Sequence, residues 1–153
     1  MLICRVEHKE GLHGPYQATN YCPAFIEILE KYDYQHKTHL SDNQFSDRKH
    51  PSPFDEPELK FIIHQNFTRM FILGFESLDY LCDWFYSYPK DIITILKDFN
   101  YHIAVYDVDD ITEQIPKTIK LSTTNIPIKS YYIGERQSIF IRSYATLVDS
   151  LEL

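Results

Sequence analysis

The stretch from residue 70 to residue 108 constrains the fold more than any other part of the chain. It predicts a strand over 70–74, helices over 77–85 and 89–100, and a second strand over 101–108. Apolar residues fall on one face of each helix: Leu78, Leu81, Cys82, Phe85, Ile92, Ile95, Leu96 and Phe99. Since the rest of the chain must pack on this unit, we expect the following residues to be largely buried: Leu78, Leu81, Phe85, Leu96, Phe99, Ile103 and Val105.

Local signals mark the ends of these helices. Ser77 is a typical N-cap, because its side-chain oxygen can accept a hydrogen bond from the first turn. Pro89 suits the first turn of the next helix, since its missing N–H is not needed there. Asn100 tolerates the left-handed backbone that ends a helix.

The chain of 153 residues is long enough for one domain with its own core, and we expect a single domain over 1–153. A hydrophobic fraction of 44% and a charged fraction of 24% exclude a disordered chain. The 12 tyrosines cannot all be buried, since each hydroxyl needs a partner, so some are expected on a binding surface.

The remaining segments complete a prediction of the fold class. We expect strands over 2–7, 117–121, 126–133 and 137–144, helices over 23–32 and 57–65, and a short apolar tail over 145–153. Residues 33–56 read as one long polar loop, and a loop of this length is usually functional. The sequence therefore predicts an α+β fold, with three to four helices packed on a mixed or antiparallel sheet.

The net charge of −7 argues against nucleic acid as the primary ligand, because phosphate backbones select basic surfaces. The charge is uneven along the chain. Lys117, Lys120 and Lys129 belong to a basic stretch over 114–144, whereas acidic residues crowd 107–113. This pattern fits either two solvated faces or a local site for a phosphate or an acidic partner.

Location follows from the cysteines and from the hydrophobicity. Three cysteines with no CxxC spacing favour reduced thiols in a cytosolic protein. Charged residues occupy much of the first ten positions, and no apolar run is long enough to span a membrane. We expect a cytoplasmic protein that makes no contact with membranes.

The loop histidines His36, His39 and His50 are the residues that most resemble metal ligands. Zinc prefers four closely spaced His and Cys ligands, and the loop contains no cysteine, so we expect no metal. A metal-bearing enzyme that uses these histidines is therefore the least favoured functional hypothesis. The chain also lacks GxGxxG, GxxxxGK[ST] and GxSxG, which leaves the common dinucleotide, P-loop and hydrolase classes without support.

Several short motifs occur in a characteristic order: Arg5-Val-Glu7 with Gly14-Pro15-Tyr16, His50-Pro-Ser-Pro53, Gly74-Phe-Glu-Ser-Leu78, Trp84-Phe85, Ala104-Val-Tyr-Asp-Val108 and Gly134-Glu-Arg-Gln-Ser-Ile-Phe140. In this order the chain resembles a group of small, uncharacterised phage-encoded accessory proteins. The resemblance implies a protein of a phage or mobile element that acts in the cytoplasm of its bacterial host.

More distantly, the same order is similar to the ADP-ribosyltransferase pattern of a first-strand Arg, a Ser-containing segment and a late catalytic Glu. The matching positions are Arg5, Ser77, and Glu135 or Gln137. This resemblance implies NAD as cofactor, with the arginine pairing to a phosphate and the carboxylate stabilising an oxocarbenium ion. The Ser-Thr-Ser run of those enzymes is missing, and glutamine stands where glutamate is expected.

These observations favour a non-enzymatic accessory or anti-defence protein that uses no cofactor. Such a protein would bind a host protein or protein–nucleic acid complex through tyrosine-rich and charged faces, and inhibit or modulate it. Homo-oligomerisation is compatible with this hypothesis. The alternative is an NAD-using transferase, or a degenerate relative that still binds a nucleotide.

Overall fold

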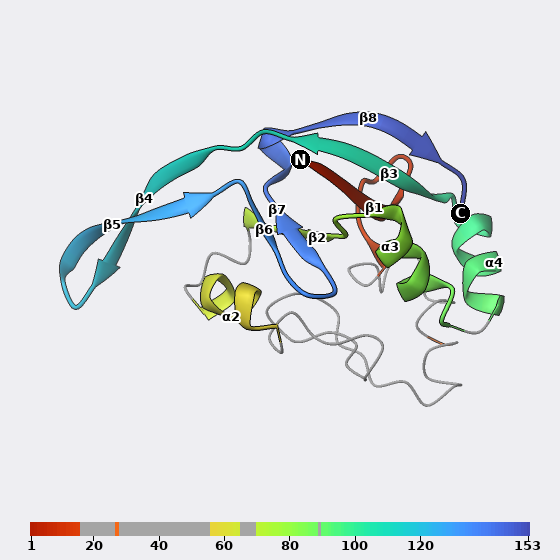
Figure 1. Cartoon of the computed structure of the whole chain (residues 1–153), viewed down its shortest axis with the longest axis horizontal. Helices are drawn as coiled ribbons and strands as arrows, with labels where there is room; N and C mark the ends of the chain where they lie inside the picture. The colour runs from red at the N-terminus through yellow and green to blue at the C-terminus, as the bar shows by residue number, and fades with distance from the viewer. Residues whose placement is uncertain (16–26, 28–55, 65–69, 89) are drawn as a thin grey trace.

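The computed structural model describes residues 1–15, 27, 56–64, 70–88 and 90–153 (Figure 1). The elements within these ranges are β1 (Leu2–His8), α2 (Pro57–His64), β2 (Ile72–Gly74), α3 (Leu78–Phe85), α4 (Lys90–Asp98), β3 (Tyr101–Val108), β4 (Thr112–Ile119), β5 (Ser122–Lys129), β6 (Tyr131–Ile133), β7 (Ser138–Phe140), the 3₁₀ helix η4 (Arg142–Tyr144) and β8 (Ala145–Leu151). The predicted helix over 23–32 and loop over 33–56 lie almost entirely outside the described residues.

The described part is mostly β, so the prediction of an α+β fold with three to four helices packed on one sheet is wrong. Three α-helices are present in this part, and each is only eight or nine residues long. The strands instead form three separate sheets. The prediction failed because residues 112–116 of β4, residues 122–125 of β5 and the whole of β8 were not recognised as strands, which left the helices too prominent.

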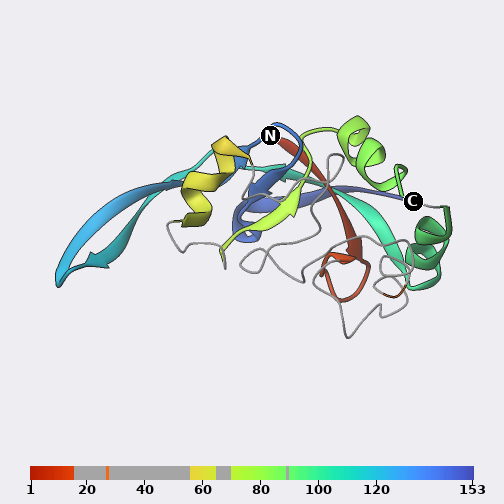
Figure 2. The ribbon, with the colours of Figure 1, turned by 90° about the horizontal axis from the view of Figure 1, so that it is seen from below.

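The central sheet has the strand order β1-β3-β8 and is antiparallel throughout. β1 pairs with β3 along its whole length, from Leu2↔Asp107 to His8↔Tyr101. One face packs on α3 and α4, as Figures 1 and 2 show from two directions. The buried cluster on this face comprises Cys4, Val6, Phe75, Leu81, Trp84, Phe85, Tyr88, Ile92, Leu96, Tyr101, Ile103 and Leu153.

The second sheet has the order β2-β7-β6 and lies against the first. Cys4 and Phe75 join the two sheets through a reciprocal pair of backbone hydrogen bonds of 2.7 and 2.8 Å. A small core with Ile3, Tyr106 and Phe140 fills the space between them. A third cluster packs beneath α2: Leu59, Ile62, Phe71, Ile128, Ile139 and Ile141.

The third sheet is the hairpin of β4 and β5, residues 112–129, which we call the arm. Its strands pair from Thr112↔Lys129 to Ile119↔Ser122. In Figures 1 and 2 the arm extends away from the other elements at one end of the molecule. Near its base, Ile115, Ile126 and Ile128 contact the cluster beneath α2. The base of the arm is therefore anchored in the core, and its outer half is not.

The predicted helix ends at Ser77 and Asn100 are confirmed, whereas Pro89 lies outside the described residues. The Ser77 hydroxyl accepts a hydrogen bond of 3.2 Å from the Tyr80 N–H at the start of α3. Asn100 has a φ of 65°, the left-handed conformation expected after α4. The predicted burial of Leu78 and Phe99 is wrong, since they are 39% and 38% exposed. Trp84 takes an inward position on α3 that the predicted helix face did not include.

Candidate functional site

A buried network of charged and polar groups surrounds Glu7 on β1. The Glu7 side chain is fully buried, and its Oε2 accepts hydrogen bonds from Arg5 Nε (3.1 Å) and Arg142 Nη2 (2.7 Å). Its Oε1 accepts one from the Tyr106 hydroxyl (2.5 Å). Arg142 also donates to Tyr106 Oη (2.5 Å) and to the Leu12 carbonyl (2.7 Å). The network thereby ties β1, β3, η4 and the turn after β1 into one unit.

The electrostatics of this network favour a structural role. Burial lowers the pKa of Arg5 to about 10, although Glu7 opposes the shift, so the guanidinium remains charged at neutral pH. Burial and then the bond to Glu7 raise the pKa of Tyr106 to about 12. Burial also disfavours the charge of Arg142, but the hydrogen bond and charge of Glu7 outweigh it and raise that pKa. At neutral pH the two guanidinium groups of the network are thus charged and its phenol is neutral.

The three segments matched to the ADP-ribosyltransferase pattern do come together around β2. Arg5 Nη1 donates a hydrogen bond of 2.6 Å to the Leu73 carbonyl on that strand. Gly74, three residues before Ser77, pairs with Ser138, which directly follows Gln137. The order of the motifs in the sequence therefore corresponds to a real proximity of backbone segments.

The side chains at these positions are nevertheless occupied by the fold. Arg5 is 4% exposed and bonded to Glu7, so it cannot reach a phosphate without breaking the ion pair. The Ser77 hydroxyl caps α3. Gln137 is buried and bonds to Glu56, while Glu135 is exposed in the turn after β6. Within the described part of the chain, Arg5, Ser77 and Gln137 thus each make hydrogen bonds that stabilise the fold.

The turn 134–137 encloses a carboxylate that sequence reasoning missed. Glu56 is buried, and its Oε2 accepts a hydrogen bond of 3.1 Å from the Arg136 N–H. Burial raises its pKa, while hydrogen bonds from the turn oppose the shift. A Cβ at Gly134 would lie 2.1 Å from Glu56 Oε2, so only glycine fits there. In the sequence, the only available signal was that Glu56 directly precedes a predicted helix. That position indicates neither that the carboxylate is buried nor what binds it.

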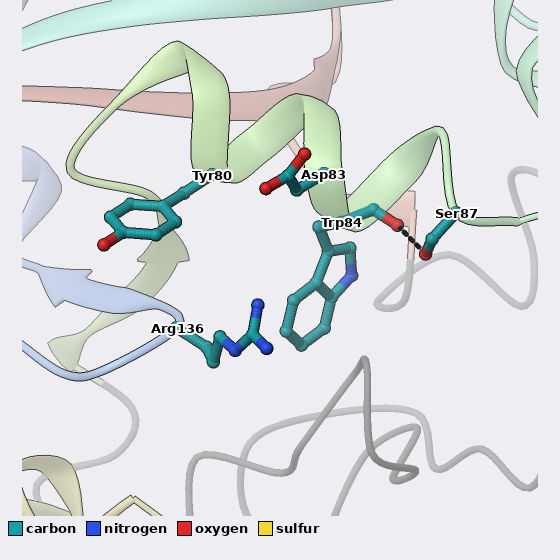
Figure 3. A pocket seen from close by; sticks show the side chains of 5 residues that line it. All are labelled: Tyr80, Asp83, Trp84, Ser87 and Arg136. Carbon is teal, nitrogen blue, oxygen red and sulfur yellow. Dashed lines mark hydrogen bonds between the residues drawn. The ribbon is translucent and has the colours of Figure 1, made fainter.

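A small pocket of about 290 Å³ lies between α3 and the turn 134–137 (Figure 3). Tyr80, Asp83, Trp84, Ser87 and Arg136 line it, and the Arg136 side chain extends toward the Trp84 ring. The Ser87 hydroxyl donates a hydrogen bond of 2.7 Å to the Trp84 carbonyl.

The described part of the chain lacks both a cluster of potential metal ligands and a helix able to span a membrane. No group of three or more His, Cys, Asp or Glu residues that could hold a metal ion occurs within it. His36, His39 and His50 lie outside the described residues, so the prediction that they bind no metal stays a prediction. None of the described helices is long and apolar enough to cross a membrane.

The arm is the described feature that most resembles an interaction surface. Leu121 at its tip is fully exposed, and Ile119 beside it is 47% exposed. The expected tyrosine-rich surface is not observed among the described tyrosines, of which only Tyr80 and Tyr86, at α3, are exposed. The exposed apolar surface of the arm is instead aliphatic, and lysines accompany it.

The fold and these sites define a small, mostly β protein with a buried ionic network and a projecting hairpin. The chain belongs to a bacteriophage family, since the model of the family described as Bacteriophage T4 Y00F protein matches residues 1–153. It is thus a phage-encoded accessory protein, as the order of its short motifs indicated. No curated protein and no solved structure matches it, and an ADP-ribosyltransferase scaffold finds no support.

Proposed function

We propose that this phage protein acts by binding a macromolecule of the bacterial host, in the host cytoplasm, and not by catalysing a reaction. The observation that carries the proposal is the arm, whose outer half contributes little to the core and presents exposed aliphatic side chains. Exposed apolar groups cost solubility unless a partner covers them. When the arm binds a surface of a host protein, it excludes the molecules that normally bind there. This competition would inhibit or modulate the host protein, which can be a defence protein.

The proposal is tested by shortening the arm without disturbing its base. Replacing residues 116–125 with Asn-Gly places a two-residue turn directly after the pair Ile115↔Ile126. These two isoleucines, which contact the core, remain in place. The shortened protein should therefore fold like the wild type. A matched control, with Leu147→Ser and Val148→Ser, removes exposed apolar groups from β8 instead.

The measurement is quantitative mass spectrometry of host proteins retained by the three immobilised variants, followed by reconstitution of each candidate complex from purified components. The wild type and the β8 control should form a complex of defined stoichiometry with the same host protein, and the shortened protein should not. Identical retention by all three variants would contradict the proposal.

A further inference from the structure

We propose that the tip of the arm inserts Leu121 and Ile119 into an apolar socket on a partner protein, and that acidic residues surround this socket. This inference rests on the proposed function and adds to it the chemistry of the partner. The distribution of apolar side chains along the arm, the turn at its tip, its edges and its charge support the inference independently.

The first observation is an apolar group at the tip of the arm, separate from the apolar group at its base. The pairs Glu113↔Ile128, Ile115↔Ile126, Lys117↔Thr124 and Ile119↔Ser122 share one face of the hairpin, so the polar pair Lys117↔Thr124 lies between the isoleucines of the base and Ile119. The isoleucines near the base pack beneath α2. Beyond the polar pair, Ile119 is 47% exposed and the neighbouring Leu121 is fully exposed. These two apolar side chains at the tip thus have no part in the core clusters of the described residues.

The second observation is the turn itself. Lys120 and Leu121 have φ values of 48° and 68°, which corresponds to a type I′ turn. Asn-Gly is the usual pair for this turn, because left-handed backbone costs other residues about 1 kcal/mol each. A leucine at this position therefore lowers the stability of the hairpin and exposes apolar surface to water. Neither folding nor solubility accounts for it, whereas contact with a partner does.

The third observation concerns the edges of the arm. A two-residue turn is closed by a hydrogen-bonded pair, here Ile119↔Ser122, and hydrogen-bonded and non-bonded pairs then alternate. Pro116↔Asn125 and Gln114↔Pro127 are consequently non-bonded pairs, so the two proline nitrogens face outward. Since proline has no N–H to donate, each outer edge is interrupted. The arm is thus poorly suited to adding a partner strand, and its tip and apolar face remain for binding.

The fourth observation is the charge of the arm. The arm contains Lys117, Lys120 and Lys129 but only one acid, Glu113, so its formal charge is +2. Since the whole chain has a net charge of −7, the residues outside the arm carry a net charge of −9. A cationic tip favours a surface with carboxylates. Nucleic acid would attract the three lysines but would be repelled by the strongly acidic remainder. The charge distribution therefore favours an acidic protein as partner.

The test is photo-crosslinking in a host-cell extract, with a photoreactive amino acid placed at position 121 and, as a control, at position 148 on β8. We expect a crosslink from position 121 to a peptide of a host protein that combines apolar residues with Asp or Glu. The same crosslink should persist after nuclease treatment and be absent from position 148. The double variant Lys117→Gln and Lys120→Gln should weaken it, whereas Lys97→Gln on α4 should not.

The affinity of the purified complex provides a second measurement. Leu121→Ser should weaken binding about tenfold or more, as expected for an anchor residue. The lysine double variant should weaken it about threefold or more at low salt and have little effect at high salt.

Several outcomes would overturn the inference: crosslinks to nucleic acid, to a second copy of this chain or to a neutral or basic surface, and an affinity that neither Leu121→Ser nor the lysine variant changes. If the shortened arm still abolishes binding in that case, the proposed function stands and only the tip chemistry is wrong. If no host protein distinguishes the wild type from the shortened protein, the proposed function itself fails.

Discussion

Replacing Glu7 with glutamine tests whether the buried network determines stability. The substitution keeps the shape of the side chain but removes the only acidic partner in the network. Arg5, which is 4% exposed, would then keep its buried charge but lose the carboxylate to which its Nε donates. Arg142 would lose less, because its side chain is 31% exposed and water can screen its charge.

The expected cost is about 3 kcal/mol, the lower end of the 3–5 kcal/mol that removal of one partner from a buried ion pair usually causes. Urea unfolding can measure it through the fluorescence of Trp84, the single tryptophan, which packs against Phe75 in the core. Glu10→Gln, an exposed acid just after β1, serves as the control and should change stability little. A cost below about 1 kcal/mol for Glu7→Gln would refute the structural role of the network.

Three further predictions concern other parts of the molecule. Gly134→Ala should destabilise the protein by about 1–3 kcal/mol in the same assay, because the new methyl group would overlap Glu56 and a backbone carbonyl; unchanged stability would show that the turn can relax. Burial lowers the pKa of His102, so below its ordinary value of 6.5 the unfolded chain binds a proton that the folded chain does not. The free energy of unfolding should therefore decrease from pH 8 to pH 6, and it should decrease less steeply in His102→Gln. Equal pH dependence in the wild type and in the variant would contradict this prediction. Calorimetric titration with NAD should give no saturable binding up to millimolar concentrations, because Arg5 is engaged with Glu7, and saturable heat would restore the transferase hypothesis.

Local sequence signals predicted the α3–α4 unit well. The strand over 101–108 has the bounds predicted for it, and the cap and stop signals at Ser77 and Asn100 are confirmed, because each depends on neighbouring residues alone. Arg5 and Glu7 are two residues apart on one strand, so their ion pair is a contact that local sequence can suggest. The other members of the network, Tyr106 and Arg142, lie 99 and 135 residues from Glu7, and no local pattern links them.

The hairpin of the arm and the strand β8 were not predicted, for different physical reasons. The strands expected over 117–121 and 126–133 overlap the arm, but its turn contains Lys120-Leu121 in place of the Asn-Gly that signals a type I′ hairpin, and the predicted strand ran through that turn. β8 is mostly exposed and lies at an edge of the central sheet, so its composition did not indicate burial. Both elements are defined by pairing with other strands, which hydrophobic periodicity does not reveal.

The central claim, that the residues at the tip of the arm serve binding at the expense of stability, is tested most directly by Lys120→Asn combined with Leu121→Gly. This change gives the turn its preferred residues and removes the exposed leucine. The melting temperature should rise, while the affinity for the host partner identified with the wild type should fall about tenfold or more. A variant that gains stability and binds the partner as tightly as the wild type would contradict the claim.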